Sequence, residues 1–492
     1  MRPMTLLRLA LAGTRTDAVR VLLTGFSAGL AGLGVLAALT VVAIPTVANG
    51  GNNVSPQYRN ALLAEAGLRP GVVFALVLLT VPVLALAGQC ARLGAPARDR
   101  RLSSIRLAGA TPGQTVAIAA TETGVASSLG TLAGLGIYLG GRELLHRPGA
   151  DGRLPLPTDV LPPWWALAAV CVGIPLLSAL VAAVMLRRVV VTPLGVVRRV
   201  RTKRPKPWPG VLIAVGVGTT ALIVPLQRGV GFLPPQVFLL LVLFAMLAVT
   251  AGTVLGTGWI SYRIGQLLHR FARRPAGLIA ARRLMADPWS GSRTLAALLG
   301  CLVLAGSAAV LRAWFAADFA LGNEVMRRYA ATQGVDYIPP EPSFHLESLD
   351  LVNLAITVGL LIATGGLVVA LTESVTSRRR AYAALVATGV GRGTLARALL
   401  WQSMAPAALG VLLALAVGTG LAYGLFGTTV TAYDFSVCPA GDCEQPRIVQ
   451  NVPFPLVDVA LFGVGGLVAL LAAVGVGLLF LRASTALEEL RV

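Results

Sequence analysis

Few side chains in this sequence are spaced for chemistry, and the clearest pair is Cys438 and Cys443. The other three cysteines fall in or beside apolar stretches, where a lone cysteine is usually a small packing residue. A disulfide between Cys438 and Cys443 would suit an oxidising compartment. The alternative is a metal site, but no other thiol is near and the histidines lie far away in the sequence, at His146, His269 and His345. We therefore expect a disulfide and no metal.

Nucleotide hydrolysis by this chain is excluded by its lysines. A Walker A loop needs a lysine that follows glycine and precedes Ser or Thr, because this lysine must reach the phosphates. The chain has only two lysines, Lys203 and Lys206, and they are followed by Arg204 and Pro207. Neither has a glycine before it. We therefore expect no ATPase activity in this chain.

Ionisable residues inside apolar stretches would indicate ion coupling, and few are present. Arg312, Glu373 and Asp458 lie near the ends of such stretches, where snorkelling is the ordinary explanation. Glu122 lies deeper, within 114–140. Because it follows a short surface helix, we expect it to bind a basic neighbour or a helix end at the membrane interface, and not a substrate.

The composition indicates that membrane helices position these residues. Of 492 residues, 56% are hydrophobic and only 13% are charged, whereas soluble domains carry about 25% charge. The chain is therefore an all-α polytopic membrane protein. Stretches long enough to cross a hydrocarbon core of about 30 Å lie near 21–46, 71–91, 114–140, 164–186, 209–226, 236–260, 294–316, 351–372, 395–424 and 456–481.

The fifth and sixth of these stretches are the least certain spans. Pro209, Pro225 and the short link between the two stretches would also suit a re-entrant hairpin. Eight spans is therefore the alternative to ten.

The net charge of +20 becomes a topology signal once the charges are sorted by loop. Loops on one side of the ten spans hold 31 of the 41 Lys and Arg and are +24 overall, while the other side is −4. The positive-inside rule places both termini in the cytoplasm. An amphipathic helix, Met4–Ala18, is expected on the inner surface before the first span. The basic residues then face anionic lipid headgroups, and we expect no nucleic-acid binding.

The sequence contains an internal repeat about 280 residues apart. The stretch from Arg100 to Thr111 begins with arginines, continues as a short amphipathic helix, stops at a glycine and enters the third span; the stretch from Arg380 to Gly391 does the same before the ninth. We therefore expect two parallel four-helix units joined by a two-helix connector. Their predicted boundaries are 1–200, 201–277 and 278–492. Parallel units argue against the inverted-repeat secondary carriers.

These residues resemble the FtsX/MacB-like permease family of ABC transporters. The resemblance rests on the basic residues, the Gly-containing turn and an acid, Glu122, about a dozen residues later. The second copy departs from the pattern, since Val386 stands where Arg106 does and Gln402 stands where Glu122 does. Glu122 and Gln402 are the polar residues expected at the membrane interface.

The two-unit, ten-span layout is most similar to bacterial permeases that confer resistance to antimicrobial peptides. Those permeases carry a large extracellular domain between spans seven and eight, whereas the corresponding loop here, 317–350, has only 34 residues. The loop 47–70 is also short, which argues against the periplasm-spanning stalks of the MacB branch. The membrane cavity, and not an external domain, is expected to set specificity.

The resemblance implies a separate cytoplasmic ABC ATPase, which supplies ATP and Mg²⁺ binding and acts as one dimer per permease chain. The chain itself needs no cofactor. We expect it to be a multi-pass subunit in a bacterial plasma membrane that exports or extracts an amphipathic, membrane-associated lipid, peptide or antibiotic. The alternative is a complex that relays ATPase movement to an extracellular cell-envelope partner without transport. The residues expected to couple to the ATPase are Arg100, Arg101, Arg106, Gly109, Arg379, Arg380 and Gly389.

Overall fold

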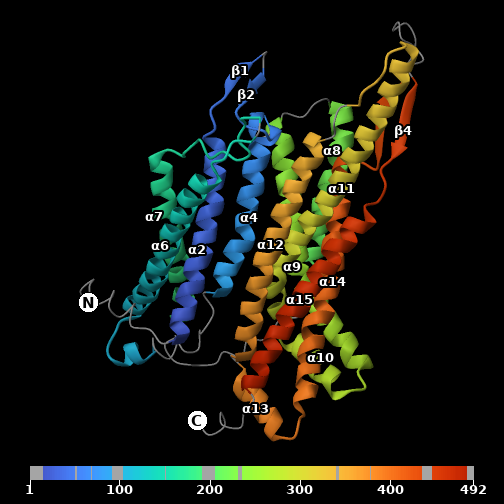
Figure 1. Cartoon of the computed structure of the whole chain (residues 1–492). Helices are drawn as coiled ribbons and strands as arrows, with labels where there is room; N and C mark the ends of the chain where they lie inside the picture. Colours follow the sequence, from blue (N-terminus) through green and yellow to red (C-terminus); the bar gives the residue numbers. More distant parts are fainter. Residues whose placement is uncertain are drawn as a thin grey trace. The chain divides into compact units, whose positions relative to one another are not determined.

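The computed structural model describes residues 15–49, 52–67, 69–90, 103–149, 151–190, 205–230, 235–339, 343–376, 378–434 and 446–484. Each of the ten apolar stretches expected from the sequence is largely helical (Figure 1). In chain order these helices are α2 (Arg15–Val42), α4 (Arg69–Cys90), α6 (Pro112–Leu145), α7 (Trp164–Val190), α8 (Pro209–Val230), α9 (Pro235–Phe271), α11 (Trp289–Thr332), α12 (Ser343–Thr376), α14 (Arg392–Phe426) and α15 (Leu456–Ser484).

Seven of the helices in the described part of the chain are long and apolar enough to cross a membrane: α2, α7, α9, α11, α12, α14 and α15. The chain is thus a mainly helical, multi-pass membrane protein, as the composition predicts. α8 contributes a shorter apolar helix, Pro209–Ile223, and α6 carries Thr, Ser, Gln and Glu side chains among its apolar residues. The full layout of ten crossings stays a prediction.

The chain forms two compact units that are not contiguous in sequence. Unit 1 comprises Met1–Thr202, Leu361–Arg392 and Ala473–Val492, and unit 2 comprises Lys203–Leu360 and Gly393–Ala472. Both α12 and α15 therefore contribute to both units. The division into 1–200, 201–277 and 278–492 concerns the sequence repeat and remains a prediction.

Unit 1 is organised around α2, which packs against α4, α6 and α7. α2 and α6 approach closely because glycines face each other across their contact: a Cβ added at Gly29 would lie 2.8 Å from the Gly130 carbonyl oxygen. Gly134 faces Gly29 in the same way. Small residues four positions apart on a helix, such as Gly130 and Gly134, allow helix backbones to approach closely in a membrane.

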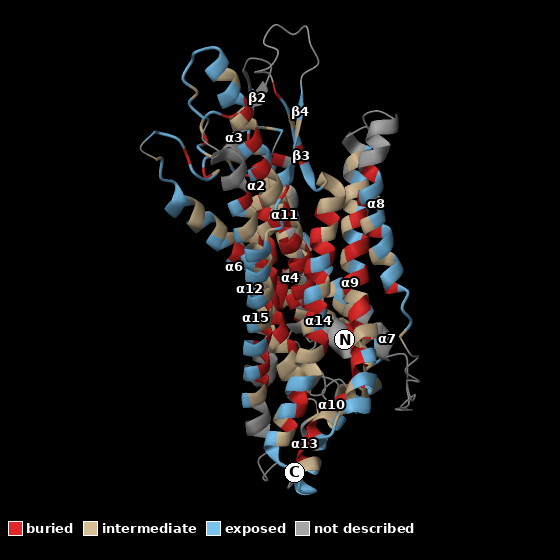
Figure 2. Cartoon of the chain, turned by 90° about the vertical axis from the view of Figure 1, so that its right-hand side faces the viewer, coloured by how far each residue is buried: buried red, intermediate tan, exposed pale blue. Residues whose placement is uncertain are grey.

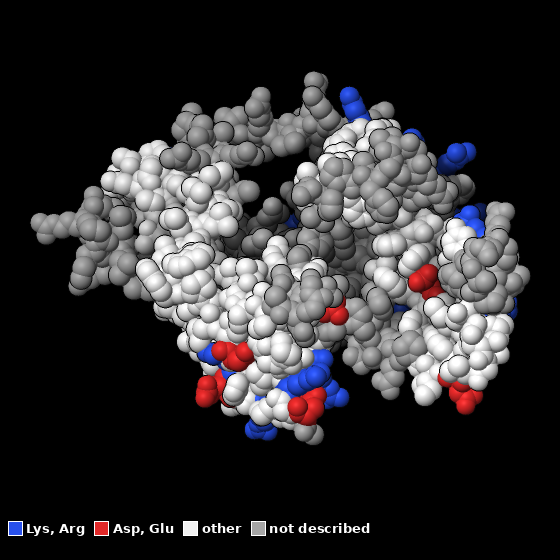
Figure 3. All heavy atoms as spheres, turned by 90° about the horizontal axis from the view of Figure 1, so that it is seen from above, with Lys and Arg blue, Asp and Glu red and all other residues white. Residues whose placement is uncertain are grey.

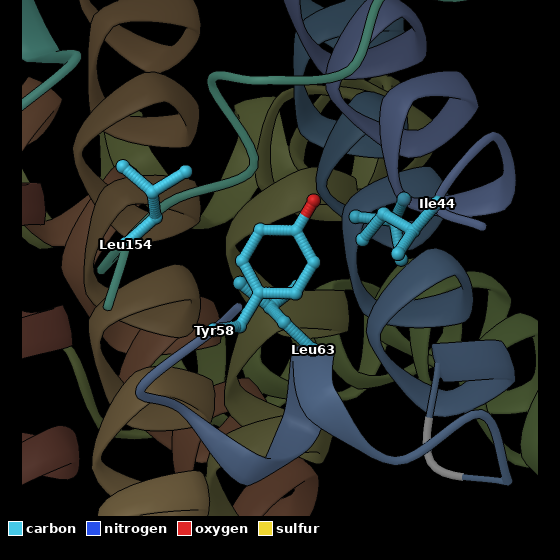
Figure 4. Packing of buried hydrophobic residues seen from close by; sticks show 5 residues of the cluster. Ile44, Tyr58, Leu63 and Leu154 are labelled. Atoms are coloured by element: carbon cyan, nitrogen blue, oxygen red, sulfur yellow. The ribbon is translucent and has the colours of Figure 1, made fainter. Parts of the chain in front are cut away.

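A small folded cap closes one end of unit 1. It contains the hairpin β1 (Val47–Asn49) and β2 (Asn52–Val54), the short helix α3 (Ala61–Ala64) and part of the segment between α6 and α7. We call the described residues within 43–67 and 146–163 the Tyr58 cap. Its core is the buried cluster shown in Figure 4, which comprises Val41, Ile44, Tyr58, Leu63 and Leu154. The loop expected at 47–70 is therefore short but has a core of its own.

Two buried polar side chains hold the Tyr58 cap together. The Tyr58 hydroxyl donates to Asp159 Oδ1 at 2.7 Å, and burial beside this carboxylate raises the pKa of Tyr58 above its ordinary value. Arg69 is only 6% exposed. Its guanidinium donates to the Leu63 carbonyl at 2.9 Å, to the Ile44 carbonyl at 2.9 Å and to Ser55 Oγ at 2.6 Å.

Unit 2 is organised around α11 and α9, which pack against each other. The amphipathic helix α10 (Pro275–Ala286) folds back on α9, with Leu284 against Gly265. α11 also meets α14, where Ser307 Oγ donates to the Gly418 carbonyl at 2.9 Å. Buried residues gather along α11 and α14, whereas α15 is largely exposed (Figure 2).

α11 is longer than the sequence predicts. The expected span ended near residue 316, but the helix continues to Thr332, so the first half of the expected loop 317–350 is helical. The hairpin of β3 (Thr429–Tyr433) and β4 (Arg447–Asn451) packs against this extension. The shared apolar cluster comprises Ala317, Leu321, Val430 and Val452, with Trp314 and Tyr423 at its edge.

Ion pairs of unit 2 lie near the C-terminal end of α11 and in its middle. Arg327 and Arg328 fall within the expected loop 317–350 but lie on the helix and pair with Glu324; Arg328 also approaches Asp434 beyond β3 at 3.7 Å. Arg312 pairs with Asp350 of α12, which replaces the expected snorkelling. On the face seen in Figure 3, some of the described acidic and basic side chains lie next to one another.

Candidate functional site

Two turns of closely matched geometry lead into α6 and α14. The first turn, residues 104–111, ends a short helix at 103–107, and the second turn, residues 384–391, ends α13 (Arg379–Ala387). Gly109 has φ +96° and Gly389 has φ +91°. This left-handed conformation is inexpensive only for glycine.

The hydrogen bonds of the two turns also correspond. In the first turn, the Gly109 amide donates to the Arg106 carbonyl at 2.9 Å and the Ala110 amide to the Ile105 carbonyl at 3.2 Å. The second turn repeats both bonds at 3.0 Å, from Gly389 to Val386 and from Val390 to Leu385. This is the Schellman pattern, which satisfies the last carbonyls of a helix and reverses the chain.

The helices that follow the turns start at matching positions. α6 starts at Pro112 and α14 at Arg392, which are 280 residues apart, as are Gly109 and Gly389. Burial corresponds as well: the turn glycines are exposed, and the first buried residues are Thr115 in α6 and Leu395 in α14. The repeat read from the sequence therefore extends to backbone conformation at these turns.

The two copies differ in how the following helix is capped. Thr111 and Gln114 form a reciprocal capping box at the start of α6, with the Gln114 amide donating to Thr111 Oγ1 at 3.3 Å and the Thr111 amide to Gln114 Oε1 at 3.0 Å. Gly391 and Thr394 occupy these two places in the second copy. The first turn is therefore fixed to its helix by side chains as well as by backbone.

The structure locates part of the expected coupling set. Gly109 and Gly389 form the two turns, and Arg106 is half-exposed beside Gly109. Arg379 and Arg380 start α13, but their side chains lie outside the described residues, as do Arg100 and Arg101 altogether. Within unit 1, α13 lies at the end opposite the β1–β2 hairpin of the Tyr58 cap (Figure 1).

Glu122 and Gln402 occupy equivalent positions, each ten residues after the first residue of its helix. Glu122 is 7% exposed, and one turn before it Ala119 packs against Ala183 of α7. Gln402 is half-buried, and its Oε1 has no hydrogen-bond partner among the described residues. The interfacial role expected for the two residues stays a prediction.

Cys438 and Cys443 lie outside the described residues. The structure does describe the strands on either side of their loop: Tyr433 pairs with Arg447, and the Asp434 amide donates to the Pro446 carbonyl at 3.0 Å. The hairpin therefore holds the two ends of the loop together. The disulfide stays a prediction.

A family comparison adds to this geometry. Residues 353–487 match the family model described as FtsX-like permease C-terminal. These residues form an FtsX-like permease domain. The match runs from α12 through the second turn to α15, and it confirms the family suggested by the repeated turns. No curated protein matches the chain.

An FtsX-like permease is a membrane component of ABC-type transport systems and is generally not an enzyme, so the chain is a permease-type membrane subunit. Members of the family typically work with a cytoplasmic ABC ATPase. The matched segment includes one of the two turns, Gly389 included. The turns are therefore the candidate functional site of this permease.

Sequence reasoning missed the residues that organise the Tyr58 cap. Tyr58, Arg69 and Asp159 contact partners as far as 101 residues away in sequence, and only the bond from Arg69 to the Leu63 carbonyl spans as few as six residues. No local spacing links them. The one available signal was an arginine and a tyrosine in a loop between two apolar stretches, which is too common to single out a buried pair.

Replacing Gly109 or Gly389 by alanine is expected to open the corresponding turn. A non-glycine residue in the left-handed region costs about 1–2 kcal/mol, which lowers the ratio of closed to open turn by roughly 5- to 30-fold. Hydrogen exchange read by mass spectrometry should show faster exchange at the amides of Ala110 or Val390.

Gly113→Ala and Gly393→Ala are the matched controls for these two variants. They lie four residues further on, outside the left-handed region, and an added Cβ would meet no described heavy atom within 4 Å. Equal exchange in the control and turn variants would contradict the assigned role of the left-handed glycines.

Proposed function

We propose that this chain is the membrane subunit of an ABC complex that exports or extracts an amphipathic, membrane-associated compound such as a lipid, a peptide or an antibiotic. A separate ATPase binds ATP and Mg²⁺ and drives the complex. The observation that carries the proposal is the pair of Schellman turns 280 residues apart, one of them inside the FtsX-like segment. Each turn would dock on one subunit of an ATPase dimer, so one permease chain would serve one dimer.

The charge distribution supports this assignment. The turns belong to the side of the membrane whose loops together hold 31 of the 41 Lys and Arg. The positive-inside rule places that side, with both termini, in the cytoplasm. The Tyr58 cap and the β3–β4 hairpin would then lie outside the cell. An oxidising exterior would also suit the expected disulfide of Cys438 and Cys443.

Reconstitution with the partner ATPase tests the proposal. The full chain and the ABC ATPase that co-purifies with it are placed in liposomes, and ATP hydrolysis is measured with and without candidate envelope lipids and amphipathic antibiotics. We expect the permease to stimulate hydrolysis and one class of amphiphile to stimulate it further. An ATPase whose Walker A lysine is replaced by alanine serves as the control, and failure of any ABC ATPase to co-purify would refute the proposal.

The length of α11 favours a second candidate function. The helix continues 16 residues beyond the expected span and carries the β3–β4 hairpin at that end, which would suit a relay of ATPase movement to an extracellular partner. Such a complex would hydrolyse ATP without moving any amphiphile between leaflets. Hydrolysis that is insensitive to every amphiphile, with no transport in the same liposomes, would favour the relay.

A further inference from the structure

The two turns present different surfaces despite their matched backbones. Leu107, the last helical residue of the first turn, is 90% exposed. Its counterpart 280 residues later is Ala387, which is also exposed. The first turn therefore carries a projecting apolar side chain, and the second turn does not.

The residues around these positions extend the contrast. In the second turn the exposed positions are alanine, threonine or glycine, and none carries a large side chain: Ala384, Ala387, Thr388, Gly389 and Gly391. In the first turn Leu107 stands beside the half-exposed Arg106, where the second turn has Val386. At these two positions the first turn has an exposed leucine and a positive charge, where the second turn has an alanine and the half-buried Val386.

The surroundings of Leu107 separate it from the exposed leucines of the candidate membrane spans. A single exposed leucine by itself needs no explanation. Many large apolar side chains of this chain are exposed on candidate membrane spans, such as Leu176 and Leu461, where lipid covers them. Leu107 lies outside every candidate span, on a turn held by a Schellman motif and a capping box. Because this backbone is already ordered, binding a partner through the side chain costs less conformational entropy.

We infer that the two turns bind the ATPase unequally, and that Leu107 makes the first turn the stronger of the two docking sites by entering an apolar pocket of the ATPase. This inference rests on the proposed function, because the ATPase is the partner. Complete burial of a leucine corresponds to about a tenfold to hundredfold gain in affinity. The second turn lacks this contribution and binds through small side chains and backbone.

Exchanging the side chains between the turns tests the inference. The full chain in detergent is titrated with the purified ABC ATPase that co-purifies with it, and the Kd is measured for Leu107→Ala, Ala387→Leu and the double variant. We expect Leu107→Ala to weaken binding by about tenfold to hundredfold and Ala387→Leu to recover most of the loss in the double variant. Leu144→Ala is the matched control: Leu144 is 74% exposed at the opposite end of α6.

Each outcome of this titration decides a different question. Unchanged binding by Leu107→Ala, with wild type binding normally, overturns unequal docking and leaves the proposed function standing. Equal weakening by Leu144→Ala also overturns it, because the effect would then not belong to the turn. Absence of any binding by the wild-type chain overturns the proposed function and this inference with it. Both substituted positions are exposed, and matching gel-filtration profiles would show that the variants fold.

Discussion

Gly130→Ala is expected to separate α2 from α6 and to destabilise unit 1. A Cβ at Gly130 would overlap the Gly25 carbonyl oxygen, and the atoms in the way are backbone, so no side chain can turn aside. Inserting even one methyl group into a packed contact costs typically about 1–3 kcal/mol. We expect a cost at or above the upper end, because relief requires one helix to move.

Thermal unfolding in detergent, followed by the loss of the monodisperse gel-filtration peak, measures this effect. The control is Gly136→Ala on the same helix, where an added Cβ would meet no described heavy atom within 4 Å. Alanine also raises helix propensity equally at both sites. A Gly130→Ala chain as stable as the Gly136→Ala chain would show that α2 and α6 are not in close contact.

Arg69→Met is expected to unfold the Tyr58 cap while the membrane helices stay folded. The substitution keeps an unbranched side chain but removes donors to the Leu63 carbonyl, the Ile44 carbonyl and Ser55 Oγ. Each buried acceptor left without a donor costs about 1–3 kcal/mol. The Ser55 hydroxyl keeps its bond to the Pro45 carbonyl, but the two carbonyls alone amount to at least about 2 kcal/mol, which is large for a cap with one small apolar cluster.

Limited proteolysis of the purified chain measures the opening of the cap. We expect cleavage within residues 52–67 to become much faster in Arg69→Met, whereas Arg59→Met, which changes an exposed arginine of the same cap, leaves the rate unchanged. Arg69→Lys should fall between the two, because an ammonium group can reach some of the acceptors but not all three. Equal protection in all the variants would mean that the apolar cluster alone holds the cap.

The sequence predicted the membrane helices because hydrocarbon imposes a local rule, namely about 20 apolar residues for each crossing. It also predicted the glycine turns, since Gly109 and Gly389 follow amphipathic segments that recur at one spacing. No comparable local rule predicts the extension of α11 beyond residue 316. This segment mixes charged and apolar residues, and its apolar side chains Ala317 and Leu321 pack against a hairpin more than 100 residues later in the chain.

The sequence predicted where the two turns lie but not which exposed side chain distinguishes them. Gly109 and Gly389 could be identified because only a left-handed residue ends a helix in this way. Leu107 could not be identified, because exposure is a property of the folded chain. In a leucine-rich sequence, an exposed leucine cannot be told from a buried one. The Tyr58 cap was missed for a related reason: its contacts join segments as distant as Tyr58 and Asp159.

The length of α11 has a mechanical consequence. Its 44 residues correspond to a rod of about 66 Å at 1.5 Å per residue, roughly twice the thickness of the hydrocarbon core. A rod of that length acts as a lever: a tilt of about 10° about one end displaces the other end by about 11 Å. The β3–β4 hairpin, packed against one end, would travel with it. A rotation too small to open a pore would thus appear as a large displacement at the hairpin.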